Sequence, residues 1–465
     1  MPDPITTFKV VSFGCKVNQT EGLVLAARLR RRGLREVGPR APADLVIVNT
    51  CCVTAEAARQ GRQRVRRAHR RGTAVAVTGC AAHPASGEDA YARLAGLAAV
   101  DADKDRLLAR LAAAGHVPDG QGATGCLSAS APRRAKHTGG QAASGTPPTP
   151  GHERSEWPGR RCQAPSTPSQ PRSRAMLKVQ DGCPGGCAYC IVPKVRPEVW
   201  SVPPAEAVRQ AERLVAEGFR EIVICGIHLG LYGADLGPTL ADLLARLLAV
   251  EGLGRLRLSS ILPTEIDAPL LDLMAAEPER LCPHLHLSLQ SGDDEVLARM
   301  GRPYTAADFL RTVERVREAL DAPALATDVL VGFPGETEAA FARTLAVCRQ
   351  AGFTRMHVFP FSVRPGTRAA GMPGQVDGDV VRRRRRRAAE VGEDLADAYR
   401  RRLVGRRETV AVERVRPDGS AEGLAARYVR VQVPGPLPDG QGRRDLVPVR
   451  LTGVDREALV GRVEA

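Results

Sequence analysis

Short apolar runs alternate with amphipathic stretches along the first 115 residues of the chain. The apolar runs predict strands, which lie at 8–13, 45–49 and 74–78. The stretches between them place apolar residues at helical spacing, and they predict helices at 21–32 and from a Thr54 cap to about residue 71. Apolar strands separated by helices are typical of a parallel sheet covered on both faces. We therefore expect an amino-terminal three-layer parallel-sheet domain.

The same alternation is more regular between residues 176 and 402. Strands are expected at 176–180, 221–225, 255–260, 284–290, 326–331 and 356–361. Helices are expected between them at 204–217, 239–250, 268–276, 306–320 and 337–351. Six such repeats predict an α/β fold with an open or partial (β/α)6 barrel, whose chemistry lies in the loops after the strands.

The pattern changes to period two after an arginine-rich helix at 380–402. Strands are expected at 408–413, 428–433 and 445–449, with turns such as Pro417-Asp418-Gly419 between them. This pattern predicts a small β-barrel domain. The helix contains the run 382–387, which is entirely arginine. Arginines on all sides of a helix are expected to include some that contact the phosphates of a docked partner.

Residues 116–175 are rich in proline, glycine and serine and show no hydrophobic periodicity. This composition predicts a disordered linker, and its cysteines, Cys126 and Cys162, are interpreted as incidental thiols. The predicted organisation is an amino-terminal domain at 1–115, the linker at 116–175, a barrel domain at 176–402 and a β domain at 403–465.

Charge and cysteine content narrow the class of protein. The 465 residues carry a net charge of +15, which favours RNA or DNA as a partner, although an arginine-rich proteome would raise the charge of any chain. The start of the chain lacks a secretory signal, and no apolar run approaches membrane-spanning length. We expect a cytoplasmic protein with no membrane partner. Its 12 cysteines then indicate metal or redox chemistry rather than disulfides.

A cysteine follows each predicted strand of the amino-terminal domain. These residues are Cys15, Cys51 and Cys80. Because ligands collect at the carboxyl ends of parallel strands, the three thiols are expected to meet at one edge of the sheet. The alternative is that cysteine merely packs well as a small buried residue.

A second set of three cysteines, Cys183, Cys187 and Cys190, lies in one short glycine-containing loop after the first barrel strand. Thiolates are the ligands that iron–sulfur clusters and zinc require. Three ligands would leave one iron of a cluster open to a non-protein group. A zinc site would need a fourth ligand, for which His228 and Cys225 are the alternatives.

The spacing Cys183-x-x-x-Cys187-x-x-Cys190, with Tyr189 before the last cysteine, resembles the radical S-adenosylmethionine signature. The resemblance implies a [4Fe–4S] cluster on these catalytic thiolates. Its open iron would bind the amino and carboxylate groups of S-adenosylmethionine, and one electron would cleave the sulfonium to give a 5′-deoxyadenosyl radical.

The whole chain, apart from the linker, resembles the methylthiotransferases. In that family three strand-end cysteines hold a second [4Fe–4S] cluster, and a small TRAM barrel follows the radical domain. The segments 286–292, 328–337 and 359–367 are also in the style of the family. The resemblance implies that Cys15, Cys51 and Cys80 are metal ligands and that the enzyme has two clusters.

Residues Gly14-Cys15-Lys16-Val17-Asn18-Gln19 are similar to the branch that acts on N6-threonylcarbamoyladenosine at position 37 of tRNA. This implies sulfur insertion at C2 and its methylation, with a tRNA anticodon stem-loop and an external electron donor as partners. The sulfur donor is not identified. The alternatives are the isopentenyladenosine-37 branch, the ribosomal protein S12 branch, and a non-catalytic iron–sulfur or zinc protein that binds RNA.

The resemblance also indicates residues for the S-adenosylmethionine pocket, each of which could instead only support the backbone. They are Gly226, Gln290, Ser291, Asp328, Gly332 and Glu336. Candidates for tRNA phosphates are Arg62, Arg66, Arg67, the run 382–387 and the carboxyl-terminal β domain, with an ordinary charged surface as the alternative for each. The chain departs from the family pattern at four positions, and those at Trp200 and Leu262 bear on the expected substrate or cofactor contacts. These are Pro197 for glycine, Trp200 for arginine, His228 for asparagine and Leu262 for glutamate.

Overall fold

The computed structural model describes residues 5–86, 91, 96–118 and 173–464. The predicted linker at 116–175, with Cys126 and Cys162, lies almost wholly outside the described residues. None of the helices in the described ranges is long and apolar enough to cross a membrane.

The amino-terminal domain is built on a parallel sheet with the strand order β2-β1-β3-β4-β5 among its described residues. The strands are β1 (Thr7–Ser12), β2 (Arg35–Glu36), β3 (Leu45–Thr50), β4 (Ala74–Gly79) and β5 (Ala99–Val100). The helices are α1 (Lys16–Arg31), α2 (Ala55–His69) and α3 (Lys104–Ala113), with short 3-10 turns at Cys80–Ala82 and Pro84–Ser86.

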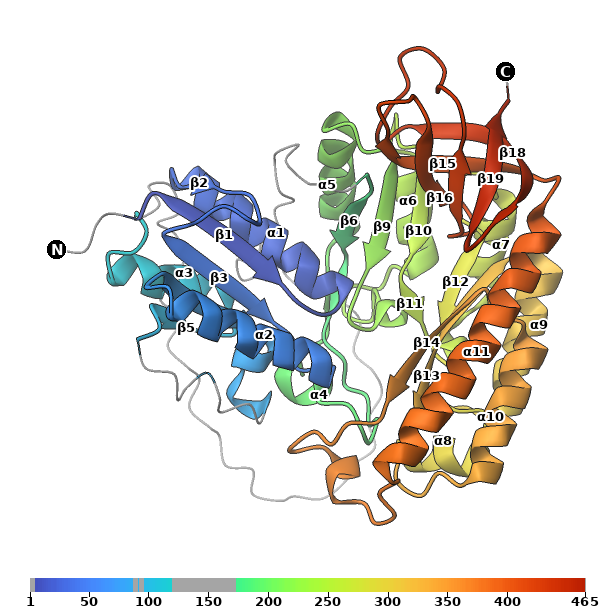
Figure 1. The fold of residues 1–465 in the computed structure, drawn as a ribbon, viewed down its shortest axis with the longest axis horizontal. Helices are drawn as coiled ribbons and strands as arrows, with labels where there is room; N and C mark the ends of the chain where they lie inside the picture. Colours follow the sequence, from blue (N-terminus) through green and yellow to red (C-terminus); the bar gives the residue numbers. More distant parts are fainter. Residues whose placement is uncertain (1–4, 87–90, 92–95, 119–172, 465) are drawn as a thin grey trace, which may run out of the picture.

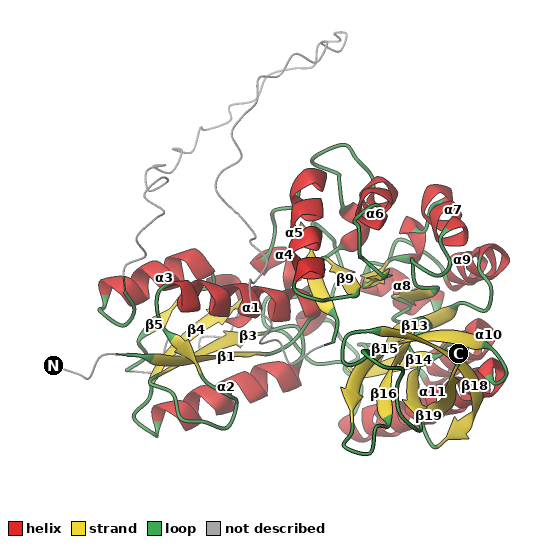
Figure 2. Ribbon diagram, turned by 90° about the horizontal axis from the view of Figure 1, so that it is seen from above, coloured by secondary structure: helices red, strands yellow, loops and turns green. Residues whose placement is uncertain are grey.

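Helices cover both faces of this sheet, as the apolar pattern predicts (Figure 2). Leu25 of α1 and Leu107 of α3 pack with Ile47 on one face. Val65 of α2 packs with Val48 on the other face. The alternation of β3 residues between these two cores explains why the whole strand is buried.

Helix α1 begins five residues earlier than the predicted start at residue 21. The reason is a cap that the apolar periodicity does not reveal. Cys15 has an extended backbone and its Sγ accepts a hydrogen bond from the backbone N–H of Asn18. A side chain that accepts such a bond satisfies one of the unpaired donors at a helix start. Cys15 therefore lies at the amino end of α1.

The central domain forms an open parallel barrel from two adjoining sheets, ordered β10-β9-β6 and β11-β12-β13-β14 (Figure 1). Its strands are β6 (Ala175–Lys178), β9 (Glu221–Cys225), β10 (Arg255–Leu258), β11 (Ser260–Ile261), β12 (His284–Leu287), β13 (Ala324–Val331) and β14 (Arg355–Pro360). A short antiparallel pair, β7 (Gln180–Asp181) and β8 (Trp200–Ser201), flanks the cysteine loop. The predicted partial barrel is confirmed.

Helices surround this barrel on its outer side. They are α5 (Pro204–Ala216), α6 (Leu240–Leu248), α7 (Ala268–Ala276), α8 (Asp294–Met300), α9 (Ala306–Ala319), α10 (Glu338–Ala351) and α11 (Gly378–Leu403). The short helix α4 (Val192–Val195), after the cysteine loop, packs instead against the amino-terminal domain. Short 3-10 turns lie at Leu229–Leu231, Pro263–Glu265 and Arg368–Gly371. The sequence pattern did not reveal α8, whose start is capped by Asp293 and whose end is Gly301 at φ 74°.

The carboxyl-terminal domain is a closed barrel with the order β15-β16-β17-β19-β18. Its strands are β15 (Arg407–Val415), β16 (Ala421–Ala425), β17 (Arg430–Val433), β18 (Leu446–Asp455) and β19 (Ala458–Val463). The small barrel is confirmed, but the alternation of apolar and polar residues had predicted only three of these strands. Strand β16, Ala-Glu-Gly-Leu-Ala, lacks the β-branched and aromatic residues on which that prediction relied.

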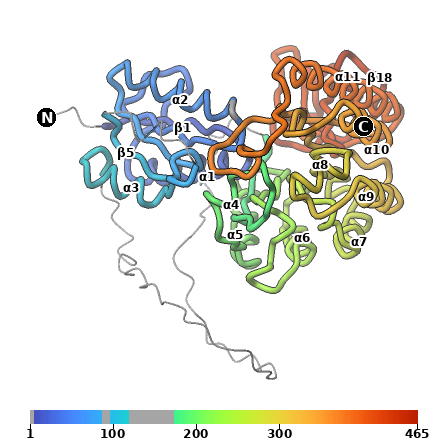
Figure 3. Tube along the Cα trace, turned by 90° about the horizontal axis from the view of Figure 1, so that it is seen from below, coloured from blue at the N-terminus to red at the C-terminus, as the bar shows by residue number. Residues whose placement is uncertain are grey.

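This small barrel packs against the amino ends of the central strands. Arg255 donates to the carbonyl of Thr409 at 2.6 Å, and Arg257 donates to that of Ala426 at 2.7 Å. Both guanidinium groups also pair with buried Glu221, at the start of β9. Ala324, the first residue of β13, belongs to the same apolar core as the small barrel. The cysteine loop follows β7, at the opposite, carboxyl end of the central strands (Figure 1). Figure 3 views the molecule from this end and shows the amino-terminal domain beside the central domain.

Candidate metal centres and their surroundings

The strand-end cysteines follow three adjacent strands of the amino-terminal sheet. Cys51 directly follows β3, and Cys80 directly follows β4. Cys15 comes shortly after Ser12, the last residue of β1. Gly14, at φ 89°, lies so close to the Cys51 sulfur that a Cβ there would overlap it. Burial raises the pKa of Cys51 most, and the neighbouring thiols of Cys80 and Cys15 raise it further, to about 12. The structure therefore brings this set together.

An N–H group is directed at each of these three sulfurs. Asn18 N lies 3.5 Å from Cys15 Sγ, and Val53 N lies 3.3 Å from Cys51 Sγ. Arg196 Nε lies 3.3 Å from Cys80 Sγ. Such donors stabilise thiolates, and hydrogen bonds to the sulfurs are a normal feature of iron–sulfur sites. The donor set therefore fits a cluster.

The loop that carries Cys183, Cys187 and Cys190 is held by its backbone as well as its side chains. The Cys183 N–H donates to the carbonyl of Arg196 at 3.1 Å, and the Ala188 N–H donates to that of Met300 at 2.8 Å. Gly182, at φ 81°, starts the loop where a Cβ would overlap the Glu198 carbonyl. The loop therefore has little freedom to move its three thiols apart.

Two charged side chains approach the sulfurs of this loop. His228 Nδ1 lies 3.3 Å from Cys183 Sγ, and Arg302 Nη1 lies 3.3 Å from Cys187 Sγ. Burial opposes ionisation of Cys183, but the hydrogen bonds from His228 and the Gly185 N–H outweigh it and lower its pKa. Burial raises the pKa of Cys190 to about 12. Bound metal displaces the proton of a coordinating thiol even when burial disfavours its ionisation.

Within the described ranges, no group of three or more His, Cys, Asp or Glu side chains is arranged to hold a metal ion. A zinc ion, with Zn–S bonds of about 2.3 Å, requires its four ligands gathered around one point. A [4Fe–4S] cluster binds each thiolate at a different iron. Of the two possible fourth zinc ligands, Cys225 is fully buried with its sulfur 3.8 Å from Thr20 Oγ1. His228 contacts Cys183 and also pairs with Glu265.

Gly226 and Gln290 lie just beyond strands β9 and β12, whereas Asp328 lies within strand β13. A Cβ at Gly226 would lie 2.8 Å from Gln180 Oε1, the atom that accepts from the His228 N–H at 2.8 Å. Gln290 has φ 67°, which is uncommon for a residue with a side chain, and its N–H donates to the Asp328 carbonyl. The Asp328 carboxylate lies 3.1 Å from His286 Nε2.

The other three pocket candidates lie within the protein framework. Ser291 Oγ is buried 3.2 Å from Thr344 Oγ1 on α10. Glu336 accepts from the Gly332 N–H at 2.7 Å and pairs with Arg384 at 2.8 Å. These contacts give Glu336 a role in holding the turn that begins at Gly332. Whether any of the six contacts the cofactor stays a prediction.

The basic residues predicted to contact tRNA phosphates occupy different environments. Arg66 and Arg67 are exposed on α2, and Arg62 is half-buried there. Arg384 of the run 382–387 is buried against Glu336, and Arg387 pairs with Glu338 at 2.6 Å. The run therefore has an inward member that stabilises the barrel, and its other members lie exposed.

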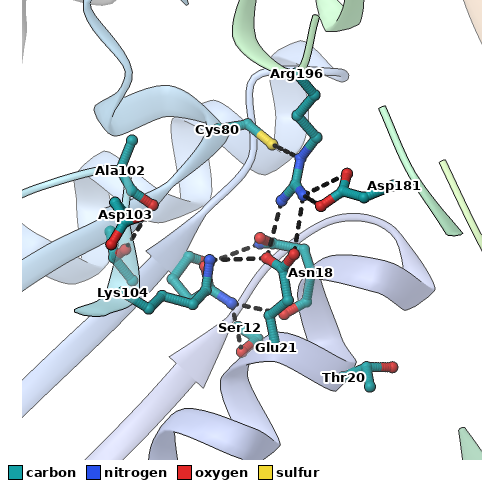
Figure 4. A network of polar contacts seen from close by, with 12 residues as sticks. Ser12, Asn18, Thr20, Glu21, Cys80, Ala102, Asp103, Lys104, Asp181 and Arg196 are labelled. Carbon is teal, nitrogen blue, oxygen red and sulfur yellow. Dashed lines mark hydrogen bonds and ion pairs between the residues drawn. The ribbon is translucent and has the colours of Figure 1, made fainter. Parts of the chain in front are cut away.

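Sequence reasoning missed an ion network between the amino-terminal domain and the barrel, which Figure 4 shows. Arg196 and Lys178 from the barrel both pair with Glu21 of α1 and with Asp181 of β7. Lys104 of α3 also pairs with Glu21, at 2.7 Å. These residues line a cavity of about 400 Å³ that Cys80 and Trp200 also line. The only sequence signal was that Arg196 opens the unusual segment 196–201.

The comparisons with known proteins agree with this architecture. Residues 177–348 match the model of the radical SAM superfamily, and residues 7–97 match that of uncharacterized protein family UPF0004. The radical S-adenosylmethionine methyltransferase TsrM from Kitasatospora setae superposes with a TM-score of 0.52 at 17% identity, covering 78% of this chain and 75% of that one. The central fold is that of a radical S-adenosylmethionine enzyme.

Sequence relatives define the family. A protein of Thermotoga maritima named threonylcarbamoyladenosine tRNA methylthiotransferase MtaB is 33% identical over 92% of this chain and 92% of its own length. A protein of a Parafrankia species named tRNA-2-methylthio-N(6)-dimethylallyladenosine synthase is 39% identical over 61% of this chain and 52% of its own length. The chain belongs to the family of radical S-adenosylmethionine tRNA methylthiotransferases. It is a transferase whose cofactors are S-adenosylmethionine and [4Fe–4S] clusters, which confirms the resemblance.

Proposed function

We propose that the protein converts N6-threonylcarbamoyladenosine at position 37 of tRNA to its 2-methylthio derivative in the cytoplasm. The observation that carries this proposal is the meeting of three strand-end thiols in a domain that contacts the radical loop through Arg196. The relative from Thermotoga maritima, named for this substrate, matches over nearly the full length. The anticodon stem-loop would be bound by exposed arginines such as Arg66 and Arg67.

In this proposal Cys183, Cys187 and Cys190 hold the catalytic [4Fe–4S] cluster, and Cys15, Cys51 and Cys80 hold the second. When bound, the clusters supply the electron that cleaves S-adenosylmethionine and a place for the sulfur that is transferred. The protein's own residues fix the thiols, of which Cys51 and Cys80 are buried, those of the loop are half-buried and Cys15 is exposed. Arg302 and His228 bring positive charge and N–H donors to the catalytic loop, which helps to hold its thiolates.

The substrate can be tested by mass spectrometry of tRNA nucleosides from a deletion strain. Loss of 2-methylthio-N6-threonylcarbamoyladenosine, restored by the wild-type gene but not by a Cys187→Ala variant, is the expected result. Retention of that nucleoside would overturn the assignment. Loss of the isopentenyl derivative instead would favour the second substrate, which the Parafrankia relative supports. Loss of the modification from ribosomal protein S12 would instead favour that protein as the substrate.

The enzyme itself can be distinguished from a non-catalytic RNA-binding protein. Reconstituted protein should hold about eight irons per chain, since each [4Fe–4S] cluster contains four. On reduction by an external electron donor it should release 5′-deoxyadenosine from S-adenosylmethionine. Iron near zero, or intact S-adenosylmethionine, would contradict the proposal.

A further inference from the structure

Arg196 forms a direct hydrogen bond to one cysteine of each set. Its backbone carbonyl accepts from the N–H of Cys183 at 3.1 Å. Its side-chain Nε donates to the sulfur of Cys80 at 3.3 Å. The two cysteines belong to different domains and lie 103 positions apart in the sequence, at 80 and 183. A single residue therefore connects the amino-terminal thiol site with the radical loop.

The guanidinium group is fixed by carboxylates on both sides (Figure 4). Its Nη1 lies 2.8 Å from the Asp181 carboxylate, and its Nη2 lies 2.8 Å from that of Glu21. The side chain is only 12% exposed. A buried charge persists only when such partners compensate its lost hydration. The pairing thus leaves Arg196 with one preferred position.

The contact with Cys80 uses the Nε–H, which the pairing with the two carboxylates does not engage. Both Nη atoms are directed at carboxylates, so Nε–H remains to face the sulfur. A lysine could carry the same charge, but it lacks the planar group that holds several partners in fixed directions. Charge-assisted hydrogen bonds are also the stronger kind. Arginine at this position therefore serves both the ion network and the thiolate.

We propose that Arg196 is a positioning residue that holds the Cys80 thiolate and raises the reduction potential of the amino-terminal cluster. The proposal rests on the ligand set given under the proposed function. Hydrogen bonds to ligating sulfurs and nearby charge are among the factors that set cluster potentials. A positive donor at a ligating sulfur stabilises the reduced, more negative cluster, and its removal destabilises that state.

The test measures the amino-terminal cluster by itself. A background variant that carries Cys183→Ala, Cys187→Ala and Cys190→Ala retains only this cluster, at about four irons per chain. Redox titration monitored by electron paramagnetic resonance then gives its midpoint potential. Arg196→Gln and Arg196→Lys are compared in this background. Lys178→Gln is the matched control, because Lys178 pairs with the same two carboxylates, Glu21 and Asp181.

Arg196→Gln is expected to shift the midpoint potential downward, with four irons retained. Arg196→Lys keeps the charge and should give a smaller shift in the same direction. Lys178→Gln should shift the potential less than Arg196→Gln does. An unchanged potential in both Arg196 variants, or an equal shift in Lys178→Gln, would overturn the role of Arg196. Absence of iron from the background variant would instead refute the ligand set and the proposal with it.

Discussion

His228 Nδ1 lies 3.3 Å from the sulfur of Cys183, while its Nε2 pairs with Glu265. The ring thus connects a carboxylate on one side with the Cys183 thiol on the other. Burial lowers the pKa of His228, but the hydrogen bonds to Cys183 and Glu265 outweigh it and raise the pKa to about 9. His228 therefore brings a positive charge to the loop that carries Cys183.

Replacing His228 by alanine should change the catalytic cluster without removing it. The three thiolates remain, but the N–H donor at Cys183 is lost. We expect full iron content, an altered electron paramagnetic resonance spectrum of the reduced cluster, and slower cleavage of S-adenosylmethionine. His228→Asn should restore part of the rate, because the amide again offers a donor. His116→Ala, at the end of α3, serves as the control and should leave the spectrum unchanged.

Cys80→Ala and Cys187→Ala should each remove a different cluster. Each variant is expected to hold about four irons instead of about eight, since each cluster contributes four. Only Cys187→Ala should lose the cleavage of S-adenosylmethionine, because it alters the loop that is predicted to bind this cofactor. Iron analysis and assay of 5′-deoxyadenosine provide the measurements. Loss of all iron in both variants would refute two independent sites.

Gly79→Ala should disturb the amino-terminal site through the backbone. At φ 89° a side chain is strained, and a Cβ would also overlap the carbonyl of Thr50. Gly72 is the matched control, because its φ is 72° and no atom lies within 4 Å of a Cβ there. The strain at Gly72→Ala should cost about 1–2 kcal/mol of unfolding free energy. Gly79→Ala should cost more and lower the iron content, and equal costs in urea unfolding would contradict this prediction.

Glu221 should stabilise the fold in a pH-dependent way. Burial opposes its ionisation, but Arg255 and Arg257 outweigh it and lower its pKa from 4.5 to about 2. Its contribution is therefore complete above pH 4.5 and is lost as the pH falls toward 2. At pH 7, Glu221→Gln should cost about 3–5 kcal/mol, because it leaves two buried arginines without their carboxylate. Urea unfolding should show that the difference in unfolding free energy between Glu221→Gln and the wild type shrinks as the pH falls toward 2.

Glu390→Gln is the control for this prediction. Glu390 pairs with Arg386 at 3.9 Å, and both side chains are mostly exposed. Exposed pairs contribute little to stability, so this change should leave the urea midpoint where it is. A Glu221→Gln variant as stable as Glu390→Gln at pH 7 would show that the buried pair does not stabilise the interface with the small barrel.

Two arginines of the run 382–387 should respond differently to substitution. Arg384 is buried against Glu336, so Arg384→Gln should reduce stability by about 3–5 kcal/mol. Arg385 is exposed, so Arg385→Gln should leave stability unchanged. If Arg385 contacts a tRNA phosphate, its removal should also reduce the salt dependence of tRNA binding by about one unit of slope. Filter binding at several salt concentrations measures this effect.

The two cysteine sets could be found from the sequence because both depend on local signals. A strand pattern followed by cysteine places a thiol at a sheet edge, and the spacing at 183, 187 and 190 is visible within one loop. The groups that face these sulfurs could not be found in the same way. Arg196 is separated from Cys80 by 116 positions, and Arg302 from Cys187 by 115. Only the folded arrangement of domains brings such pairs together.

The small barrel and the cysteine loop lie at opposite ends of the central strands, and this separation has a consequence for substrate size. Strand β13, eight residues long, extends from Ala324 in the core of the small barrel to Val331, just before Gly332. At about 3.3 Å per residue, it spans about 26 Å. A single nucleoside cannot reach across this length, whereas a folded RNA stem can. Under the proposed function, an RNA that contacted both the small barrel and the cysteine loop would therefore have to extend over about this length.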